Sequence, residues 1–186
     1  MLIGITGTLG AGKGTIAQYL AKKHEFMYVS VRAFFAAEVV QEGKAVTRAS
    51  VAEAAERIRH AHGATYPLEQ LLNNTPRLKN VVIESIRTIN EAQYLKTRGD
   101  ALWAVDADVR TRFERIKAQS AEFAALSFEE FNSADQKELH SENPDLPSVL
   151  QLKDTMASEV FINNGTKDEL FAQVDRALLK AKQGQT

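Results

Sequence analysis

The stretch GITGTLGAGKGTIAQYL, residues 4–20, constrains the fold more than any other, because it places five glycines beside the first apolar run. Glycines adopt positive φ without steric cost, so the backbone of residues 7–14 can curl and direct successive N–H groups at one anion. A helical pattern begins near Lys13 and adds the positive end of its dipole to the same place. The loop therefore predicts a phosphate-binding site, and the alternative is a glycine-rich turn with a surface lysine.

The loop follows a predicted strand and opens a predicted helix, which is the context that a P-loop requires. We expect Lys13 to lie in a solvent-facing loop and its ammonium to reach the β- and γ-phosphates of a nucleotide. The residues of this segment predicted to bind the nucleotide are Gly7, Thr8, Gly10, Ala11, Gly12, Lys13, Gly14 and Thr15.

Composition limits the rest of the interpretation. The chain has 186 residues, 44% of them hydrophobic, which is enough for one core, so we predict a single domain over residues 1–186. A net charge of −1 argues against nucleic acid or an anionic membrane as a partner. The absence of cysteine excludes disulfides and thiolate chemistry, and the N-terminus shows no signal-peptide pattern. We expect a cytoplasmic protein that is a monomer or a weak homodimer.

Short apolar runs alternate with amphipathic segments along the whole chain. The predicted strands are residues 1–6, 26–30, 80–85, 101–107 and 159–164. The predicted helices are residues 13–23, 32–42, 48–62, 67–73, 89–98, 109–119, 127–139 and 167–182. Four of the strands lack polar alternation at their centres, which predicts burial on both faces. The pattern indicates an α/β protein with a doubly wound, five-stranded parallel sheet.

Two connections are too long to be simple crossovers. We interpret residues 31–79 as a helical acceptor-binding insertion, and residues 117–158 as a lid-like insertion. Long segments that emerge from one edge of a sheet are where mobile lids are often built.

The loop has one informative departure from the common pattern, because Gly14 separates Lys13 from Thr15. In this respect it resembles the P-loop of adenylate kinase and of other nucleoside monophosphate kinases. The resemblance implies a P-loop NTPase fold, ATP and Mg²⁺ as cofactors, and Thr15 beside the metal.

The segment VVIESIRT, residues 81–88, extends this resemblance. In the family the corresponding strand carries an acid beside the magnesium and an arginine that binds the acceptor phosphate, and Glu84 and Arg87 match these positions. The family usually has Asp-Gly where this chain has Glu84-Ser85. A carboxylate that ends a buried strand also lies near the phosphate loop on general grounds. The alternatives are a salt-bridge partner or a neighbour of a helix N-cap for Glu84, and a solvated surface arginine for Arg87.

Two later segments match less specifically. VDADVRTRFERI, residues 105–116, resembles the segment where an arginine stacks on adenine, which indicates Arg115, with Arg112 one turn earlier. INNGTKDEL, residues 162–170, resembles the turn whose backbone reads the adenine edge. The residues of that turn are Asn164, Gly165 and Thr166, and a plain turn with Thr166 as a helix N-cap explains them almost as well.

The acceptor side departs from the family pattern. The expected acid and arginine of the second helix fall on Ala33 and Ala36. Arg32 is a nearby substitute, and so is Arg57 or Arg59. Phe35, with Phe34, is a candidate for a base pocket or, more commonly, for core. We predict an acceptor site made by Arg32, Phe35, Arg59, Glu84 and Arg87.

The lid also lacks the family's further arginines, since the chain reads RIKAQS from Arg115 and places Gln119 where a cation is expected. Lys117, or Lys137 from a later helix, is the remaining cation, although an ammonium does not bind phosphate bidentately. A solvated helix face is the alternative for both lysines. The residues predicted to act in catalysis are Lys13, Arg87, Arg115 and Lys117.

The whole pattern, over roughly residues 1–182, resembles small nucleotide kinases described as adenylate kinase-related or dephospho-CoA kinase-like. This resemblance implies transfer of the γ-phosphoryl group of ATP to a nucleotide acceptor, foremost a nucleoside monophosphate. The first alternative is dephospho-CoA kinase, which needs a general base that Ala33 does not supply. The second is a nucleotide-binding regulator or slow NTPase.

Overall fold

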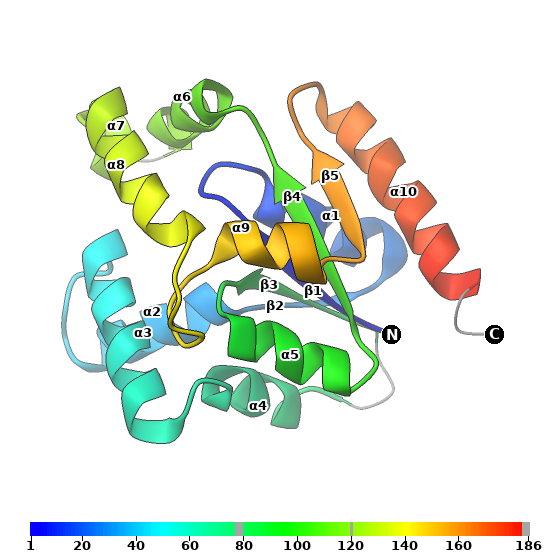
Figure 1. Cartoon of the computed structure of the whole chain (residues 1–186), viewed down its shortest axis with the longest axis horizontal. Helices are drawn as coiled ribbons and strands as arrows, with labels where there is room; N and C mark the ends of the chain where they lie inside the picture. The colour runs from blue at the N-terminus through cyan, green and yellow to red at the C-terminus, as the bar shows by residue number, and fades with distance from the viewer. Residues whose placement is uncertain (77–79, 120, 184–186) are drawn as a thin grey trace.

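The computed structural model describes residues 1–76, 80–119 and 121–183. Its centre is a five-stranded sheet with the order β2-β3-β1-β4-β5, in which every neighbouring pair is parallel (Figure 1). The strands are β1 (Leu2–Gly7), β2 (Met27–Ser30), β3 (Val81–Ile86), β4 (Ala101–Asp106) and β5 (Glu159–Ile162). The predicted doubly wound α/β fold is confirmed.

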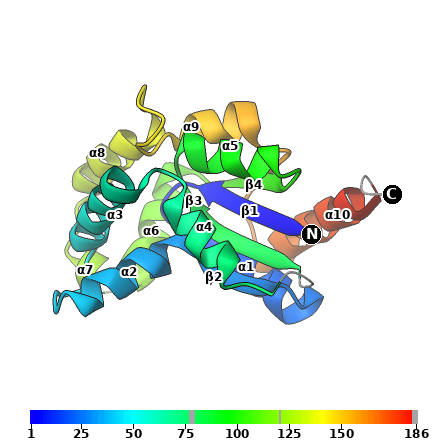
Figure 2. The same cartoon turned by 90° about the horizontal axis from the view of Figure 1, so that it is seen from below.

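Helices cover both faces of the sheet, as Figure 2 shows from below. On one face, α1 (Lys13–His24) and α10 (Lys167–Gln183) pack on Ile3, Ile5 and Trp103. The opposite face carries α2 (Val31–Gln41), α3 (Arg48–His62), α4 (Tyr66–Asn73), α5 (Ile89–Thr97) and the π-helical turn η1 (Leu152–Met156). Because successive strand side chains point to opposite faces, one short strand supplies both cores.

The remaining helices are α6 (Val109–Gln119), α7 (Ala121–Ala124), α8 (Phe128–Leu139) and α9 (Val149–Gln151). Helices α6 to α8 share a separate small core around Phe113, Ile116 and Phe131. They lie beyond the end of β4 (Figure 1), and α8 contacts α3 through the ion pair of Glu138 with Arg48. The carboxyl edge of the sheet is therefore enclosed by elements from both predicted insertions.

Every predicted strand and helix agrees with the structure to within two residues at each end, but three short helices, α7, α9 and η1, were not predicted. The C-terminal limit of the predicted insertion 31–79 lies outside the described residues. Burial on both faces holds for β1, β3 and the centre of β4, whereas the edge strands β2 and β5 expose Tyr28, Val160 and Ile162. Edge strands have a neighbour on one side only, so an apolar run does not by itself establish burial. No helix in the described ranges has the length and apolar character needed to cross a membrane.

Candidate functional site

The glycine-rich loop connects β1 to α1 at the carboxyl edge of the sheet. Gly10 and Gly12 have φ values of 80° and 113°, which L side chains rarely adopt. A Cβ atom at Gly10 would lie 2.6 Å from the backbone carbonyl oxygen of Arg112, and one at Gly12 would lie 2.5 Å from the side-chain amide nitrogen of Asn163. These glycines are therefore required both by conformation and by space.

Helix α1 begins at Lys13 without a side-chain cap, since its N-cap residue is Gly12. The first N–H groups of a helix have no partner within the helix, and they carry its positive partial charge. In this helix they are left available for an anion held by the loop. This arrangement is the one that nucleotide phosphates use in P-loops.

The structure corrects one expectation about Lys13, which is buried and only 7% exposed. Its ammonium donates hydrogen bonds of 2.8 Å to the carbonyl oxygens of Gly7 and Thr8. Burial, helped by the charge of Arg87, lowers the pKa of Lys13 to about 8, against the opposing effect of Glu84. The loop folds around its own lysine because the glycines bring these two carbonyls within reach.

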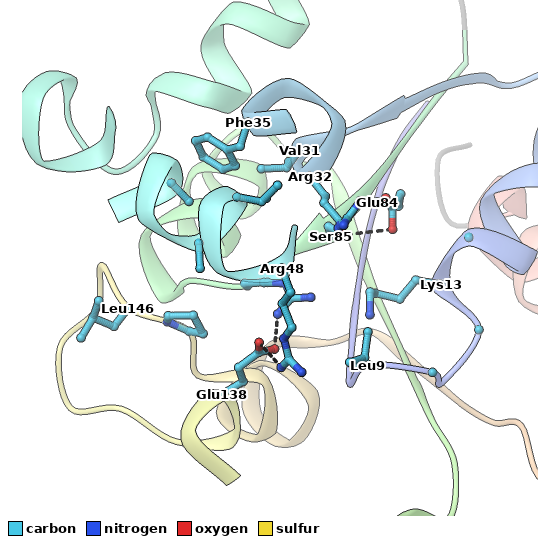
Figure 3. A pocket seen from close by; sticks show the side chains of 18 of the residues that line it. Leu9, Lys13, Val31, Arg32, Phe35, Arg48, Glu84, Ser85, Glu138 and Leu146 are labelled. Carbon is cyan, nitrogen blue, oxygen red and sulfur yellow. Dashed lines mark hydrogen bonds and ion pairs between the residues drawn. The ribbon is translucent and has the colours of Figure 1, made fainter. Parts of the chain in front are cut away.

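A cavity of about 730 Å³ opens from this loop, a size within the range of small-molecule sites. The end of the cavity at the loop is lined by residues of the loop and of α1, including Lys13, Thr15 and Gln18. The other end lies between α2 and α3 and is lined by apolar side chains of both helices and by Arg32. Figure 3 shows this end from close by. The apolar side chains are Val31, Phe35, Val51, Ala52 and Ala55.

Glu84 stands at the end of β3, is 8% exposed and lines the same cavity. One carboxylate oxygen accepts a hydrogen bond from the hydroxyl of Ser30, and the other accepts one of 2.9 Å from Ser85. Ser85 has a φ of 69°, a left-handed conformation that explains why the resembled family places glycine there. The N-cap alternative for Glu84 fits these contacts, because Ser30 is the N-cap residue of α2, whereas two hydroxyl partners are not those of a salt bridge.

The carboxylate of Glu84 also affects the pKa of Tyr28, which lies on the neighbouring strand β2. Burial, followed by the charge of Glu84, raises the pKa of Tyr28 to about 12. The phenol therefore stays protonated beside Glu84 and is available as a hydrogen-bond donor to it.

Arg87 follows β3 and lines the cavity, so it is not a solvated surface residue. Both Arg87 and Arg48, from the first turn of α3, form ion pairs with Glu138 of α8. The Arg48–Glu138 distance is 2.6 Å, and Figure 3 shows Arg48 directed toward the carboxylate of Glu138. Neither Arg48 nor Glu138 was predicted as a site residue.

Phe35 and Arg59 serve packing as well as the cavity wall. Phe35 is 2% exposed, and the guanidinium group of Arg59 lies over its ring at 4.8 Å. Arg59 also donates a hydrogen bond of 2.6 Å to Glu91, a fully buried acid in the capping box of α5. Arg59 therefore holds α3 to α5, and this ion pair competes with the predicted contact to an acceptor.

Four of the predicted residues lie to one side of the cavity. Arg115 donates a hydrogen bond of 2.8 Å to the carbonyl oxygen of Asn163. It therefore lies beside the turn of Asn164, Gly165 and Thr166, as the resemblance implies. In that turn Thr166 exchanges capping hydrogen bonds with Glu169, so the plain-turn explanation also fits the geometry. None of these four is among the described residues that line the cavity.

Asn163 was missed by the sequence analysis, although it contacts the loop directly. It is buried, and its amide donates a hydrogen bond of 2.7 Å to the carbonyl oxygen of Ala11. It thus connects the P-loop to the turn after β5. Only the tertiary structure distinguishes Asn163 from its neighbour Asn164.

The predicted placement of Lys117 is not supported. Its ammonium lies 5.2 Å from the centre of the Phe113 ring, and Lys137 is exposed. Neither lysine is among the described residues that line the cavity, whereas Gln119 and Phe123 are. The periodicity of α6 turns Lys117 toward the small core of α6 to α8.

Arg112 has a structural position instead of a nucleotide contact. It is 5% exposed and forms a two-pronged pair with Asp135 of α8, at 2.8 and 2.7 Å. It also donates a hydrogen bond of 3.2 Å to the carbonyl oxygen of Leu9 in the loop. Arg112 therefore ties α8 to α6 and to the phosphate loop.

The site suits a metal held mainly by a nucleotide. The described residues contain no group of three or more histidines, cysteines or acids placed to bind a metal ion. Thr15 and Glu84 both line the cavity, and Asp106, at the end of β4, is engaged by Lys153 at 2.8 Å. Magnesium commonly uses substrate phosphates, water and one or two protein oxygens, so Thr15 and Glu84 fit such a role.

Comparison with known proteins agrees with this geometry. The profile of the AAA domain family AAA_18 matches residues 3–136. A UPF0200 protein of Methanococcus vannielii is 32% identical over 184 residues, which cover 96% of this chain and 95% of the relative. Among solved structures, shikimate kinase from Bacteroides thetaiotaomicron gives a TM-score of 0.61 at 14% identity, covering 98% of each chain. A gluconokinase from Sinorhizobium meliloti gives 0.58 at 12% identity, covering 98% of this chain and 93% of the other. The fold is that of P-loop kinases.

Proposed function

This chain belongs to the AAA domain family AAA_18 and to the UPF0200 proteins, and from that membership and its site we propose an ATP-dependent phosphotransferase. Its acceptor is a nucleoside monophosphate. The observation that carries the proposal is one continuous cavity that joins the phosphate loop to a second group of cations.

The end of the cavity at the phosphate loop, which we call the donor end, has the groups needed to hold the phosphates of ATP. The loop N–H groups and the start of α1 bind the anion, and the buried Lys13 supplies a positive charge beside them. Thr15 and Glu84 would hold a Mg²⁺ ion beside these phosphates, and the ion would supply neutralisation of phosphate charge. Little covalent chemistry is required of the protein, because phosphoryl transfer depends mainly on positioning and charge.

The end of the cavity between α2 and α3, which we call the acceptor end, favours a phosphorylated and partly apolar ligand. Arg32, Arg48 and Arg87 line it with guanidinium groups, which bind phosphate bidentately. The apolar surfaces of α2 and α3, with Phe35 among them, suit a flat base. A neutral polyol acceptor would use neither the apolar side chains of α2 and α3 nor the guanidinium groups.

The loop after α8, the end of α6 and helix α7 complete the enclosure. Leu146, Pro147 and Phe123 line the cavity from this side, together with Gln119. Apolar side chains over the reacting phosphates exclude water, which would otherwise compete as the acceptor. The proposed lid therefore protects the transfer even though it contributes no arginine of its own at Gln119.

The test is a coupled assay of ADP release with AMP, GMP, CMP, UMP and dephospho-CoA, each with ATP and Mg²⁺. We expect turnover with at least one nucleoside monophosphate, and its loss in Lys13→Met. Turnover with dephospho-CoA alone would establish a ribose hydroxyl as the acceptor. ATP hydrolysis that no acceptor stimulates would instead establish a slow NTPase or regulator.

A further inference from the structure

The carboxylate of Glu138 occupies the cation pair at the acceptor end of the cavity. Its Oε1 atom accepts a hydrogen bond of 2.6 Å from Nη2 of Arg48, and its Oε2 atom pairs with Nη1 of Arg87. One oxygen is therefore committed to each arginine. The side chain of Glu138 is 21% exposed, that of Arg48 27% and that of Arg87 20%, so water only partly screens their charges.

Glu138 also stands within the electrostatic reach of the phosphate loop. Burial works to raise its pKa, but the charges of Arg87 and Arg48 outweigh burial and hold the pKa below its ordinary value, with a smaller contribution from Lys13. The carboxylate therefore remains ionised at neutral pH. It is an anion at the place where an acceptor phosphate has to approach the donor phosphates.

These ion pairs are not what anchors α8. The helix is held by Phe131, which is fully buried, and by the buried pair of Asp135 with Arg112. Partly exposed ion pairs contribute little to folding compared with such buried contacts. The position of Glu138 thus calls for an explanation beyond stability.

We propose that Glu138 is an internal competitor for the acceptor phosphate, and that the phosphate displaces it from Arg48 and Arg87 on binding. This inference rests on the proposed function, since it deepens the account of the same site. A phosphate dianion carries more charge and more oxygens than a carboxylate, so it can take over both guanidinium groups. A neutral acceptor, or water, cannot displace Glu138, so this residue sets selectivity for phosphorylated acceptors.

A competitor lowers the apparent affinity of the acceptor by the fraction of molecules in which the arginines are free. Removing its charge should therefore tighten acceptor binding on the order of tenfold. The matched control is Glu142→Gln, which removes the same charge from an exposed residue four positions later.

The experiment is calorimetric titration of inorganic phosphate, and of each nucleoside monophosphate, into the full chain. A non-hydrolysable ATP analogue with Mg²⁺ first fills the phosphate loop. We expect Glu138→Gln to bind phosphate about tenfold tighter than the wild type, and Glu142→Gln to bind it within twofold of the wild type. Unchanged or weaker binding by Glu138→Gln, with normal affinity for the ATP analogue, would overturn the proposal and make Glu138 a positioning residue.

A second variant covers the case in which Glu138→Gln does not fold. Glu138→Asp keeps the charge but is too short to reach both arginines, so it should give a smaller gain in phosphate affinity, and no gain would overturn the proposal. The experiment also distinguishes failure of the competitor role of Glu138 from failure of the proposed function. If phosphate binds tighter but no nucleoside monophosphate is phosphorylated, the competitor is supported while the proposed function fails.

Discussion

The donor and acceptor ends of one cavity are built in different ways. The donor end is a continuous loop of backbone N–H groups, shaped by Gly10 and Gly12 and closed around the buried Lys13. The acceptor end is assembled from side chains of α2, α3, β3 and α8, which are distant in sequence and form partly exposed ion pairs. Local sequence therefore specifies the nucleotide end, whereas only packing specifies the acceptor end.

The largest expected effect removes the central charge of the donor end. Lys13→Met should lower turnover about a thousandfold, because the loop loses the cation that stabilises charge on the transferring group. The melting temperature should change by only a few degrees, since methionine fills the same buried space. Coupled turnover and thermal melting measure both quantities.

The control for this variant is Lys22→Met, which changes an exposed lysine on the same helix. It should leave turnover unchanged. Full activity in Lys13→Met would break the account of the donor end, whatever the acceptor end does.

Arg87→Ala tests the acceptor end in isolation. It should lower kcat/KM for the acceptor roughly a hundredfold, because a guanidinium–phosphate contact in a partly desolvated site is lost. The affinity for ATP should stay within a few-fold of the wild type. Arg98→Ala, which removes a partly exposed arginine outside the cavity, is the matched control. Equal losses in ATP and acceptor binding would show that the two ends are not separable.

Glu84→Gln tests the junction between the two ends. Substitution of a group beside a bound metal commonly lowers metal affinity roughly 10- to 100-fold, so magnesium-dependent ATP binding should weaken within this range. Titrations of ATP with and without Mg²⁺ measure the effect. If ATP affinity is indifferent both to magnesium and to the substitution, Glu84 has a structural role only.

The pKa of Lys13 gives the donor end a pH dependence of known sign. Burial lowers this pKa to about 8, so the ammonium is present below that pH and is lost as the pH rises through it. If only the charged form binds phosphate, ATP affinity should fall about tenfold between pH 7 and pH 9. Binding by Lys13→Met should be weaker and independent of pH over this range. An unchanged wild-type affinity would show that bound phosphate does not require the charge.

The smallest expected effect concerns the lid. Gln119 lines the cavity, so Gln119→Arg should raise turnover about two- to fivefold, with little change in ATP affinity. The gain is limited because Arg48 and Arg87 already supply cations nearby. Turnover that falls, with the fold intact, would mean that the added guanidinium group obstructs the cavity.

The fold could be predicted largely from the sequence because its signals are local. Apolar runs closed by turn residues fix the strands, and the glycine pattern fixes the P-loop at one edge of the sheet. The burial of Lys13 was missed, because nothing in the sequence shows that its ammonium turns back to the carbonyl oxygens of Gly7 and Thr8. Solvent exposure of a loop residue depends on how the loop folds over it.

The acceptor end resisted prediction for a different physical reason. Arg48 and Glu138 meet although 90 residues separate them, and neither lies in a motif. Lys117 was expected at the cavity and instead packs near Phe113, since one helical step changes the direction of a side chain by about 100°. Asn163 and Asn164 are neighbours in the turn after β5, and only the tertiary structure shows that Asn163 is the one that contacts the loop.

If one cavity holds a nucleotide at each end, a single ligand that spans both ends should bind to it. Calorimetry with dinucleoside pentaphosphates, carrying adenosine at one end and each of the four nucleosides in turn at the other, measures affinity and stoichiometry together. We predict that at least one binds with 1:1 stoichiometry, more tightly than ATP does, and prevents binding of both ATP and the nucleoside monophosphate. If none binds more tightly than ATP, or if a nucleoside monophosphate still binds alongside, the two ends do not form a single phosphoryl-transfer site.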